Sequence, residues 1–397
     1  MTRAGTVPEV FLAFLRLGVT SFGGPIAHLG YFRDDLVTRR RWMDDRAYAD
    51  LVALCQFLPG PASSQVGFAM GLQRAGFWGA IVAFLGFTLP SAVLLVAFAA
   101  GASLFGGPVG GGILDGLKIV AVAIVAQAVW GMARSLTPDA PRAGIAVVAA
   151  ALALFAPGAV GQLGALAIGV VAGLVLLREA AEEPGETLPS FGVHRAVAIG
   201  SLVVAAAALI GLPLLAATTG SGLVALADAF FRSGALVFGG GHVVLPLLQA
   251  EVVQTGWVSP DVFLAGYGAA QAVPGPLFTF AAYLGAVSSV GPGGVAGAAV
   301  ALAAIFLPGF LVLVGVLPFW DALRGRPRVR AAMRGANAAV VGILGAALYT
   351  PVFTTAVTGP GPFVLALIGF VLLTRFRAPA WVVVIVGAIG GVIAALL

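Results

Sequence analysis

The chain has 397 residues, of which 60% are apolar and only 9% are Asp, Glu, Lys or Arg, with a formal net charge of +5. Soluble domains usually carry about 25% charged residues, and a membrane-spanning helix needs about 20 mainly apolar residues. Because apolar stretches follow one another along the whole chain, the composition excludes a water-soluble protein. The basic residues are arginines in short hydrophilic loops, so the positive charge indicates membrane topology rather than nucleic-acid binding.

The residue types needed for most bound metals and for catalysis are scarce. One cysteine, Cys55, excludes an internal disulfide and a cysteine-based metal cluster. The three histidines are too scattered for a zinc motif, and no GxxxxGK[ST] phosphate loop is present. We find no nucleophile–base pair and no cluster of acids and histidines. We therefore expect no enzyme, no catalytic residue, no metal site and no cofactor.

In chain order, hydropathy predicts an all-α membrane protein with six apolar elements, one linking element and six more. The first six cover 9–29, 48–72, 77–101, 113–133, 143–156 and 160–177. An acidic loop and the apolar stretch 196–218 follow. The last six cover 223–250, 262–285, 292–318, 331–350, 362–374 and 379–397. We divide the chain into a first repeat (1–178), an acidic loop with a linking transmembrane helix (179–222) and a second repeat (223–397).

The two groups of six are related by an internal duplication. At an offset of 216, set by Arg16 and Arg232, two short motifs recur: Leu15-Arg16-Leu17-Gly18 with Phe22-Gly23-Gly24-Pro25, and Phe231-Arg232-Ser233-Gly234 with Phe238-Gly239-Gly240-Gly241. A third motif, Gln56-Phe57-Leu58-Pro59-Gly60-Pro61, recurs as Gln271-Ala272-Val273-Pro274-Gly275-Pro276 at an offset of 215. Matches in the same order at nearly constant spacing are strong evidence for duplication.

Loop charge indicates that the repeats are inverted. Loop 30–47 carries five arginines, whereas its repeat partner 251–261 has none. Conversely, loop 321–334 carries five arginines and its partner 102–112 is uncharged. Because positive loops stay in the cytoplasm, the second half is inserted upside down relative to the first. Inverted-topology repeats are a common plan of secondary transporters.

The same charge rule predicts re-entrant elements. Both arginine-rich loops face the cytoplasm only if an even number of crossings separates them. That count is even when 9–29 and 48–72 dip in from the cytoplasm, and 223–250 and 262–285 dip in from outside. Gly and Pro in the middle of these stretches permit broken helices, which membranes tolerate where protein or a water-filled cavity surrounds them. Kinked helices that span fully are the alternative.

The four breaks are expected to meet near the membrane midplane. Half-helices that begin after the breaks would point their N–H groups and positive dipole ends at this centre, which favours an oxyanion. Kinking and close helix packing are the alternative role of these Gly and Pro residues. The candidate substrate-binding residues at the breaks are Gly23, Gly24, Pro25, Gln56, Pro59, Gly60, Pro61, Ser63, Ser64, Gly239, Gly240, Gln271, Pro274, Gly275, Pro276 and Thr279.

Two arginines, Arg16 and Arg232, are further candidates because they occupy aligned apolar positions shortly before the Gly-Gly breaks. A charge in such surroundings usually marks a substrate pathway. Arg232 has Asp228 four residues earlier as an ion-pair partner, whereas Leu12 occupies the corresponding position before Arg16. We therefore expect Arg16 to be the better anion ligand, unless both side chains snorkel to the interface.

Other polar positions are expected to be structural. Lys118 and Asp115 are three residues apart and predict an intrahelical ion pair near the outer membrane edge. His28 and His242 follow the Gly-Gly breaks but do not align with each other. A proton-sensing role for one of them is the alternative to a packed or interfacial histidine.

These motifs resemble those of the chromate ion transporter family in its long, two-domain form. The resemblance rests on LRLGVTSFGGPIAHL and RRRWMDDRAYADLVALCQFLPGP in the first half, and on FGGGHVVLPLL, GWVS and QAVPGP in the second. It implies export of chromate, a divalent tetrahedral oxyanion, across a bacterial plasma membrane, driven by an ion or potential gradient. One departure is Gly241 in place of Pro25, so the second break is expected to be more flexible.

The combined interpretation is a secondary transporter that exports chromate by alternating access between inverted repeats. Its expected partners are a small oxyanion and the lipid bilayer, with no nucleic acid; homodimer formation is left open. One alternative is a transporter of sulfate or another anion that carries chromate by mimicry. The other is an uncoupled anion channel.

Overall fold

The computed structural model describes residues 5–101, 107–156, 158–177, 191–238, 241–324 and 326–396, and these form helices without strands. The predicted acidic loop and the pair Gly239 and Gly240 lie outside the described residues. Five helices within the described part are long and apolar enough to cross a membrane, and shorter apolar helices accompany them. The chain is therefore an all-α, multi-pass membrane protein, as the hydropathy predicts.

The first predicted element, 9–29, is a helical hairpin. Helix α1 (Val7–Thr20) ends at a break, and α2 (Gly24–Phe32) begins after Gly23, which has a φ of 101°. The rings of Phe14 in α1 and Phe32 in α2 lie 5.5 Å apart, although the break separates them in sequence. Helix α2 therefore turns back along α1.

The second predicted element, 48–72, also returns to its starting side. Helix α3 (Asp45–Phe57) runs to the Pro-Gly-Pro tip, and α4 (Ala62–Gly101) begins after it. Helix α4 bends sharply at Ala75 and Gly76, where the backbone is not helical. A side chain on Gly71 would collide with the carbonyl of Gly79, so the two arms of α4 pack against each other. The first arm leads away from the tip and the second crosses the molecule.

Two contacts of Arg74 place the ends of both hairpins on one face. Arg74, at the bend of α4, forms an ion pair of 2.9 Å with Glu9 at the start of α1. Its guanidinium also lies 5.3 Å from the ring centroid of Trp42, which precedes α3. We call this the arginine-rich face, because the loop that contains Arg39, Arg40 and Arg41 lies here. Both first-half elements are therefore re-entrant rather than fully spanning.

The second half repeats this arrangement from the opposite side. Its first hairpin consists of α9 (Gly222–Ala235), η3 (Gly241–Val243), α10 (Val244–Leu248) and η4 (Gln249–Val253). Its second hairpin consists of α11 (Pro260–Ala270), η5 (Leu277–Thr279) and α12 (Phe280–Val287). The Ser289 N–H donates to the Trp257 carbonyl at 3.0 Å, and Gly222 packs against Gly291, so the ends of both hairpins meet. We call this the arginine-poor face.

Helices α4 and α13 (Gly294–Val316) show that the repeats are inverted. Phe84 of α4 packs on Phe306 of α13 with ring centroids 5.0 Å apart. Further along, Ala92 of α4 clusters with Ala298 of α13. Residue numbers therefore rise along one helix as they fall along the other, so the aligned helices run antiparallel. The predicted inverted repeat is confirmed.

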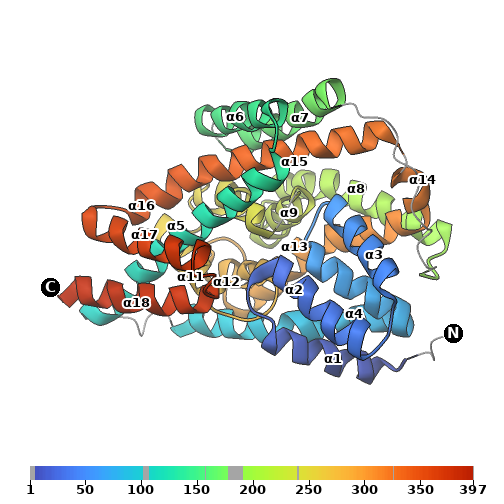
Figure 1. Cartoon of the computed structure of the whole chain (residues 1–397), viewed down its shortest axis with the longest axis horizontal. Coiled ribbons are helices and arrows are strands. Elements are labelled where there is room, and N and C mark those ends of the chain that lie inside the picture. Colours follow the sequence, from blue (N-terminus) through green and yellow to red (C-terminus); the bar gives the residue numbers. More distant parts are fainter. Residues whose placement is uncertain are drawn as a thin grey trace.

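The remaining helices make the two halves interlock. Helix α5 (Gly107–Leu136) packs on α17 (Pro360–Thr374) and α18 (Ala380–Leu396), and α15 (Pro327–Ala347) packs on α6 (Ala140–Phe155) and α7 (Gly158–Leu176) (Figure 1). Glycines allow this close approach: Gly116 lies against the backbone of Gly387, and Gly335 lies against that of Gly169. Each long helix thus packs on the last two helices of the other repeat.

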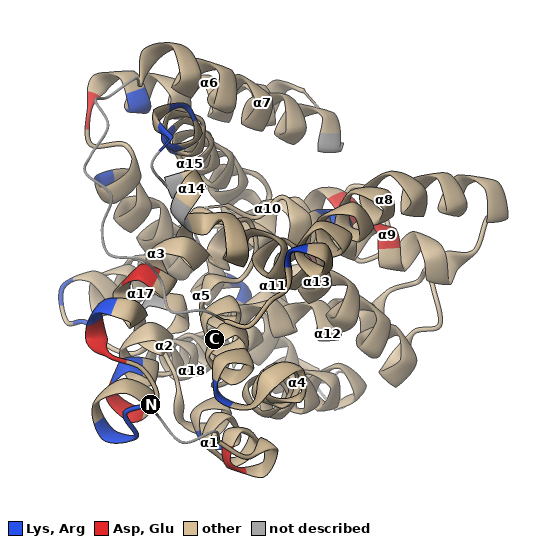
Figure 2. Cartoon of the chain, turned by 90° about the vertical axis from the view of Figure 1, so that its right-hand side faces the viewer, with Lys and Arg blue, Asp and Glu red and all other residues tan. Residues whose placement is uncertain are grey.

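The linking stretch forms α8 (Arg195–Thr219), which packs on α9 and α13. Figure 2 shows most charged positions on one side of the molecule, around the N-terminus, α3 and the adjoining ends of α6 and α15. The other short segments are η1 (Arg33–Arg39), η6 (Leu317–Phe319), α14 (Trp320–Arg324), η7 (Leu348–Phe353) and α16 (Thr354–Ala356).

Candidate functional site

The four helix breaks meet through a reciprocal pair of hydrogen bonds. The Gly60 N–H, at the tip between α3 and α4, donates to the Val237 carbonyl at 2.8 Å, just before the Gly-Gly break of the second half. The Gly275 N–H, at the aligned tip, donates to the Ser21 carbonyl of the first half at 2.9 Å. The Pro-Gly-Pro tip of each half therefore donates a hydrogen bond to the chain just before the Gly-Gly break of the other half. We call this junction of two tips and two breaks the crossing site.

Glycine is required at both tips for two reasons. Gly60 and Gly275 have φ angles of 115° and 95°, which side chains disfavour. A Cβ on Gly60 would lie 2.9 Å from the Cα of Gly309 in α13, and one on Gly275 would lie 2.8 Å from the Ser91 hydroxyl in α4. The tips thus sit against the segments that follow the aligned prolines Pro90 and Pro308.

The departure from the family pattern at Gly241 has a packing explanation. A Cβ on Gly241 would lie 3.0 Å from Cγ of Pro25, which is the aligned residue of the first half. The two positions therefore face each other across the crossing site, and a proline ring on one side leaves room for little more than glycine on the other. The greater flexibility expected at the second break stays a prediction.

The N-termini of α2 and α4 lie beside each other at the crossing site. Helix α2 begins at Gly24 with no side-chain cap, so its first N–H groups have no side-chain acceptor. No atom lies within 4 Å of the position a Gly24 Cβ would take, so open space adjoins this helix start. Ser63 in the first turn of α4 lies 3.5 Å from His28 Nδ1 in α2 and is 3% exposed. Uncapped N–H groups beside open space are suited to hold an anion.

Several buried polar atoms around the crossing site lack a hydrogen-bond partner in the described structure. Such atoms are rare in folded proteins and indicate an unseen water or ligand. They include the hydroxyls of Ser21, Ser64 and Thr88, the Gln65 amide oxygen and the Gln271 amide nitrogen. The hydroxyls and the Gln271 amide nitrogen can donate to an oxyanion, whereas the Gln65 amide oxygen can only accept, for example from a water molecule.

The other predicted site residues are less central. Thr279 is buried, but its hydroxyl donates to the Pro276 carbonyl at 2.7 Å. Gln56 is exposed, whereas its aligned partner Gln271 is partly buried. Arg16 is exposed on α1 and is not enclosed at the crossing site. Desolvation and the positive charges of Arg16 and Arg40 lower the pKa of Arg39, so Arg16 lies near enough to repel Arg39.

Two predicted ion pairs are confirmed, and each has a further partner that the sequence did not indicate. Arg232 lies 2.7 Å from Asp228 and also 3.2 Å from Glu251 in η4. Lys118 lies 2.6 Å from Asp115.

The extra partner of Lys118 is Asp261 of α11, at 2.7 Å. This contact links α5 to α11 at the arginine-poor face.

Gln65 is the main crossing-site residue that sequence reasoning missed. Its Nε2 donates to the Pro59 carbonyl and to the Gly309 carbonyl, both at 2.9 Å, so it joins the first tip to α13. The sequence shows that Gln65 follows Pro61 by four residues, but it does not show that Gln65 contacts Gly309 in α13. Thr88 and Ser91 could have been found from the sequence, because they lie on either side of Pro90, which aligns with Pro308 of α13.

Comparison with known proteins decides the family. The chromate transporter family model matches residues 8–177 and 224–392, which correspond to the two repeats. The chain belongs to the chromate transporter family. It is therefore related to membrane transport proteins, and the family match agrees with the multi-pass helical fold.

Individual relatives match over most of their length. The chromate transport protein of Pseudomonas aeruginosa is 30% identical over 344 residues, which cover 85% of this chain and 79% of that protein. The chromate transport protein of Cupriavidus metallidurans is 30% identical over 388 residues, with 96% and 92% covered. An uncharacterised transporter of Methanocaldococcus jannaschii is 24% identical, with 80% and 77% covered. No solved structure gives a significant match.

Proposed function

We propose that this protein is a secondary transporter that exports chromate across a bacterial plasma membrane. The reciprocal hydrogen bonds of Gly60 and Gly275 carry this proposal, because they bring four broken helices together at one point. The uncapped start of α2 and the buried hydroxyls nearby then offer N–H and O–H donors to a tetrahedral dianion. The names of the bacterial relatives suggest chromate as the anion.

The charges at aligned positions support transport from the arginine-rich to the arginine-poor face. At an offset of 216, Asp35 aligns with Glu251, just as Arg16 aligns with Arg232. Asp35 lies between Arg39 and Arg40, so the first-half group carries excess positive charge. In the second half, Arg232 lies between two carboxylates. A dianion is therefore attracted at the arginine-rich face, which we take as cytoplasmic, and repelled at the other.

Unequal packing of aligned helices supports alternating access. In the second half, Gly268 of α11 packs against the backbone of Leu117 in α5, and Lys118 bridges to the same helix. In the first half, Ala53 of α3 is aligned with Gly268 but is exposed. If α3 packed closely and α11 became exposed instead, the access path would close at one face of the membrane and open at the other, as inverted repeats allow.

Sulfate has the same shape and charge as chromate, so the crossing site alone does not distinguish the two anions. Export of chromate is tested in everted membrane vesicles from cells that produce the protein, where export appears as saturable uptake of labelled chromate. Unlabelled sulfate and chromate are then compared as competitors. Stronger competition by sulfate would make sulfate the main substrate.

The same vesicles test the rival mechanism of a channel. A coupled transporter accumulates chromate above its equilibrium distribution, whereas a channel only dissipates a gradient. Absence of any saturable uptake relative to vesicles without the protein would refute the proposed function. Purified protein analysed by size and mass in detergent would show whether it forms a homodimer.

A further inference from the structure

A group of three charged side chains joins α9 to η4, the two arms of the first hairpin of the second half. Arg232 Nη2 is 2.7 Å from Asp228 Oδ2 and 3.2 Å from Glu251 Oε2. The carboxylate side chains are only 10% and 13% exposed. Two carboxylates on one guanidinium leave one negative charge uncompensated. Because an unpaired charge in apolar surroundings is costly, this group favours binding of a cation.

Neighbouring elements supply no further charge to this group. Helices α7, α10 and α13 carry no titratable residue, and the only one in α8 is Arg195, at the far end of a 25-residue helix. Helix α11 carries Asp261, which pairs with Lys118, and Tyr267, whose hydroxyl lies 2.8 Å from His242 Nδ1. The excess charge is therefore confined to Asp228, Arg232 and Glu251.

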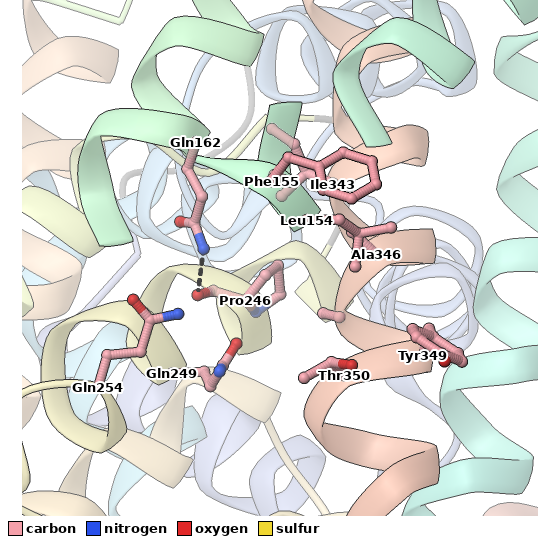
Figure 3. Close-up of a pocket in the computed structure, with 12 residues that line it drawn as sticks. Leu154, Phe155, Gln162, Pro246, Gln249, Gln254, Ile343, Ala346, Tyr349 and Thr350 are labelled. Atoms are coloured by element: carbon pink, nitrogen blue, oxygen red, sulfur yellow. Dashed lines mark hydrogen bonds between the residues drawn. The ribbon is translucent and has the colours of Figure 1, made fainter. Parts of the chain in front are cut away.

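A polar cavity of about 540 Å³ lies next to this group (Figure 3). Its polar lining includes Gln162, Gln249, Gln254 and Thr350, and apolar residues of α6 and α15 complete it. Gln249 is 8% exposed and lines the cavity, and its side chain makes no hydrogen bond to a described residue. A buried amide without a protein partner indicates that water fills this space.

A second, much smaller cavity lies between the charged group and Gln162, which also lines the large cavity. Its volume is about 10 Å³, which is close to the space that one water molecule needs. Gln162 lines both cavities, and Arg232 and Glu251 line the smaller one. The Gln162 amide is fixed between them, because its Nε2 donates to the Pro246 carbonyl at 2.8 Å. One water in the small cavity would complete a proton path from the large cavity to Glu251.

From this geometry we infer that Asp228 and Glu251 form a proton-binding site, reached through the cavity, whose occupancy drives oxyanion export. The site takes a proton rather than a metal cation, because the guanidinium already occupies carboxylate oxygens and the space beside them fits one water. An O–H bond forms on a carboxylate oxygen with a proton from the arginine-poor side and breaks when the proton leaves toward the other side. No electron is transferred. The inference rests on the proposed export function.

The site belongs to one repeat only. Leu12 stands at the position aligned with Asp228, and Asp35, aligned with Glu251, is held by Arg39 and Arg40. Asp35→Asn is therefore a matched control that removes the aligned carboxylate without touching the proposed proton site.

The test uses everted vesicles, whose lumen corresponds to the outer side, with potassium and valinomycin to hold the membrane potential at zero. Chromate accumulation is measured twice, once with the lumen one pH unit more acidic than the outer medium and once with equal pH on both sides. The readout is the ratio of the first value to the second. If one proton moves per dianion, this ratio rises to about tenfold for the wild type, because a tenfold proton gradient balances a tenfold chromate gradient. Glu251→Gln and Asp228→Asn should reduce the ratio to unity, and Asp35→Asn should not change it.

The outcomes separate the two proposals. Wild-type uptake without any pH effect overturns proton coupling but leaves the export function standing. A ratio that persists in both Glu251→Gln and Asp228→Asn, or stimulation by a sodium gradient instead, also overturns it. No uptake by the wild type refutes the export function and the coupling with it. Immunoblots of the vesicles establish that each variant is present, and either carboxylate variant suffices if the other fails to fold.

Discussion

Gly60→Ala tests whether the crossing site holds the two halves together. The substitution keeps the chain length and the donating N–H, but it adds a methyl group where the backbone has a φ of 115°. That methyl would lie 2.9 Å from the Cα of Gly309 and 3.1 Å from Gln65 Nε2. Because Gly309 contributes backbone rather than a movable side chain, the tip itself must shift away from α13, which disturbs its hydrogen bond to Val237.

The expected loss of folding free energy in Gly60→Ala has two parts. A non-glycine residue at positive φ costs about 1–3 kcal/mol, and forcing an extra carbon into a packed contact costs about 1–3 kcal/mol more. Gly76→Ala isolates the first part, since Gly76 has a φ of 66° but no atom within 4 Å of the added carbon. Gly131→Ala, inside α5 five residues before its end and with open space around it, should stabilise the protein by about 0.5–1 kcal/mol.

The assay is the thermal unfolding midpoint of each purified variant in one detergent, followed by chromate uptake in everted vesicles. The midpoints should fall in the order Gly131→Ala, wild type, Gly76→Ala, Gly60→Ala, and only Gly60→Ala should lose most of its uptake. If Gly60→Ala were as stable as Gly76→Ala and transported normally, the contact with Gly309 would not matter and the argument would be wrong.

Three further substitutions test individual contacts. Ser64→Ala should raise the KM for chromate about ten- to hundredfold, because a hydrogen bond to a charged group contributes about 1.5–3 kcal/mol; Ser201→Ala, whose hydroxyl bonds within α8, should leave KM unchanged. Arg16→Ala should raise KM at low salt and not at high salt, since an exposed charge is screened; an unchanged KM at low salt would remove Arg16 from the mechanism. Lys118→Ala should lower the unfolding midpoint more than Asp115→Ala, because only Lys118 joins α5 to α11, and equal midpoints would contradict this.

The sequence determined those features that depend on local pattern or on comparison of the two halves. Hydropathy located the helices, and the shifted arginines showed that the repeats are inverted. Glycine and proline marked the breaks, because their backbone limits are intrinsic to the residue. The pairs Arg232–Asp228 and Lys118–Asp115 were also predictable, since residues three or four apart share one face of a helix.

Only the tertiary structure decided which distant residues meet. It placed Glu251 on Arg232, Asp261 on Lys118 and Gln65 on α13, and it left Arg16 exposed rather than enclosed. It also made α5 and α15 pack on the last helices of the opposite repeat. Small residues occur on many faces of these helices, so close approach is permitted in many directions. The hydrophobic pattern therefore does not choose among them; packing of the whole molecule does.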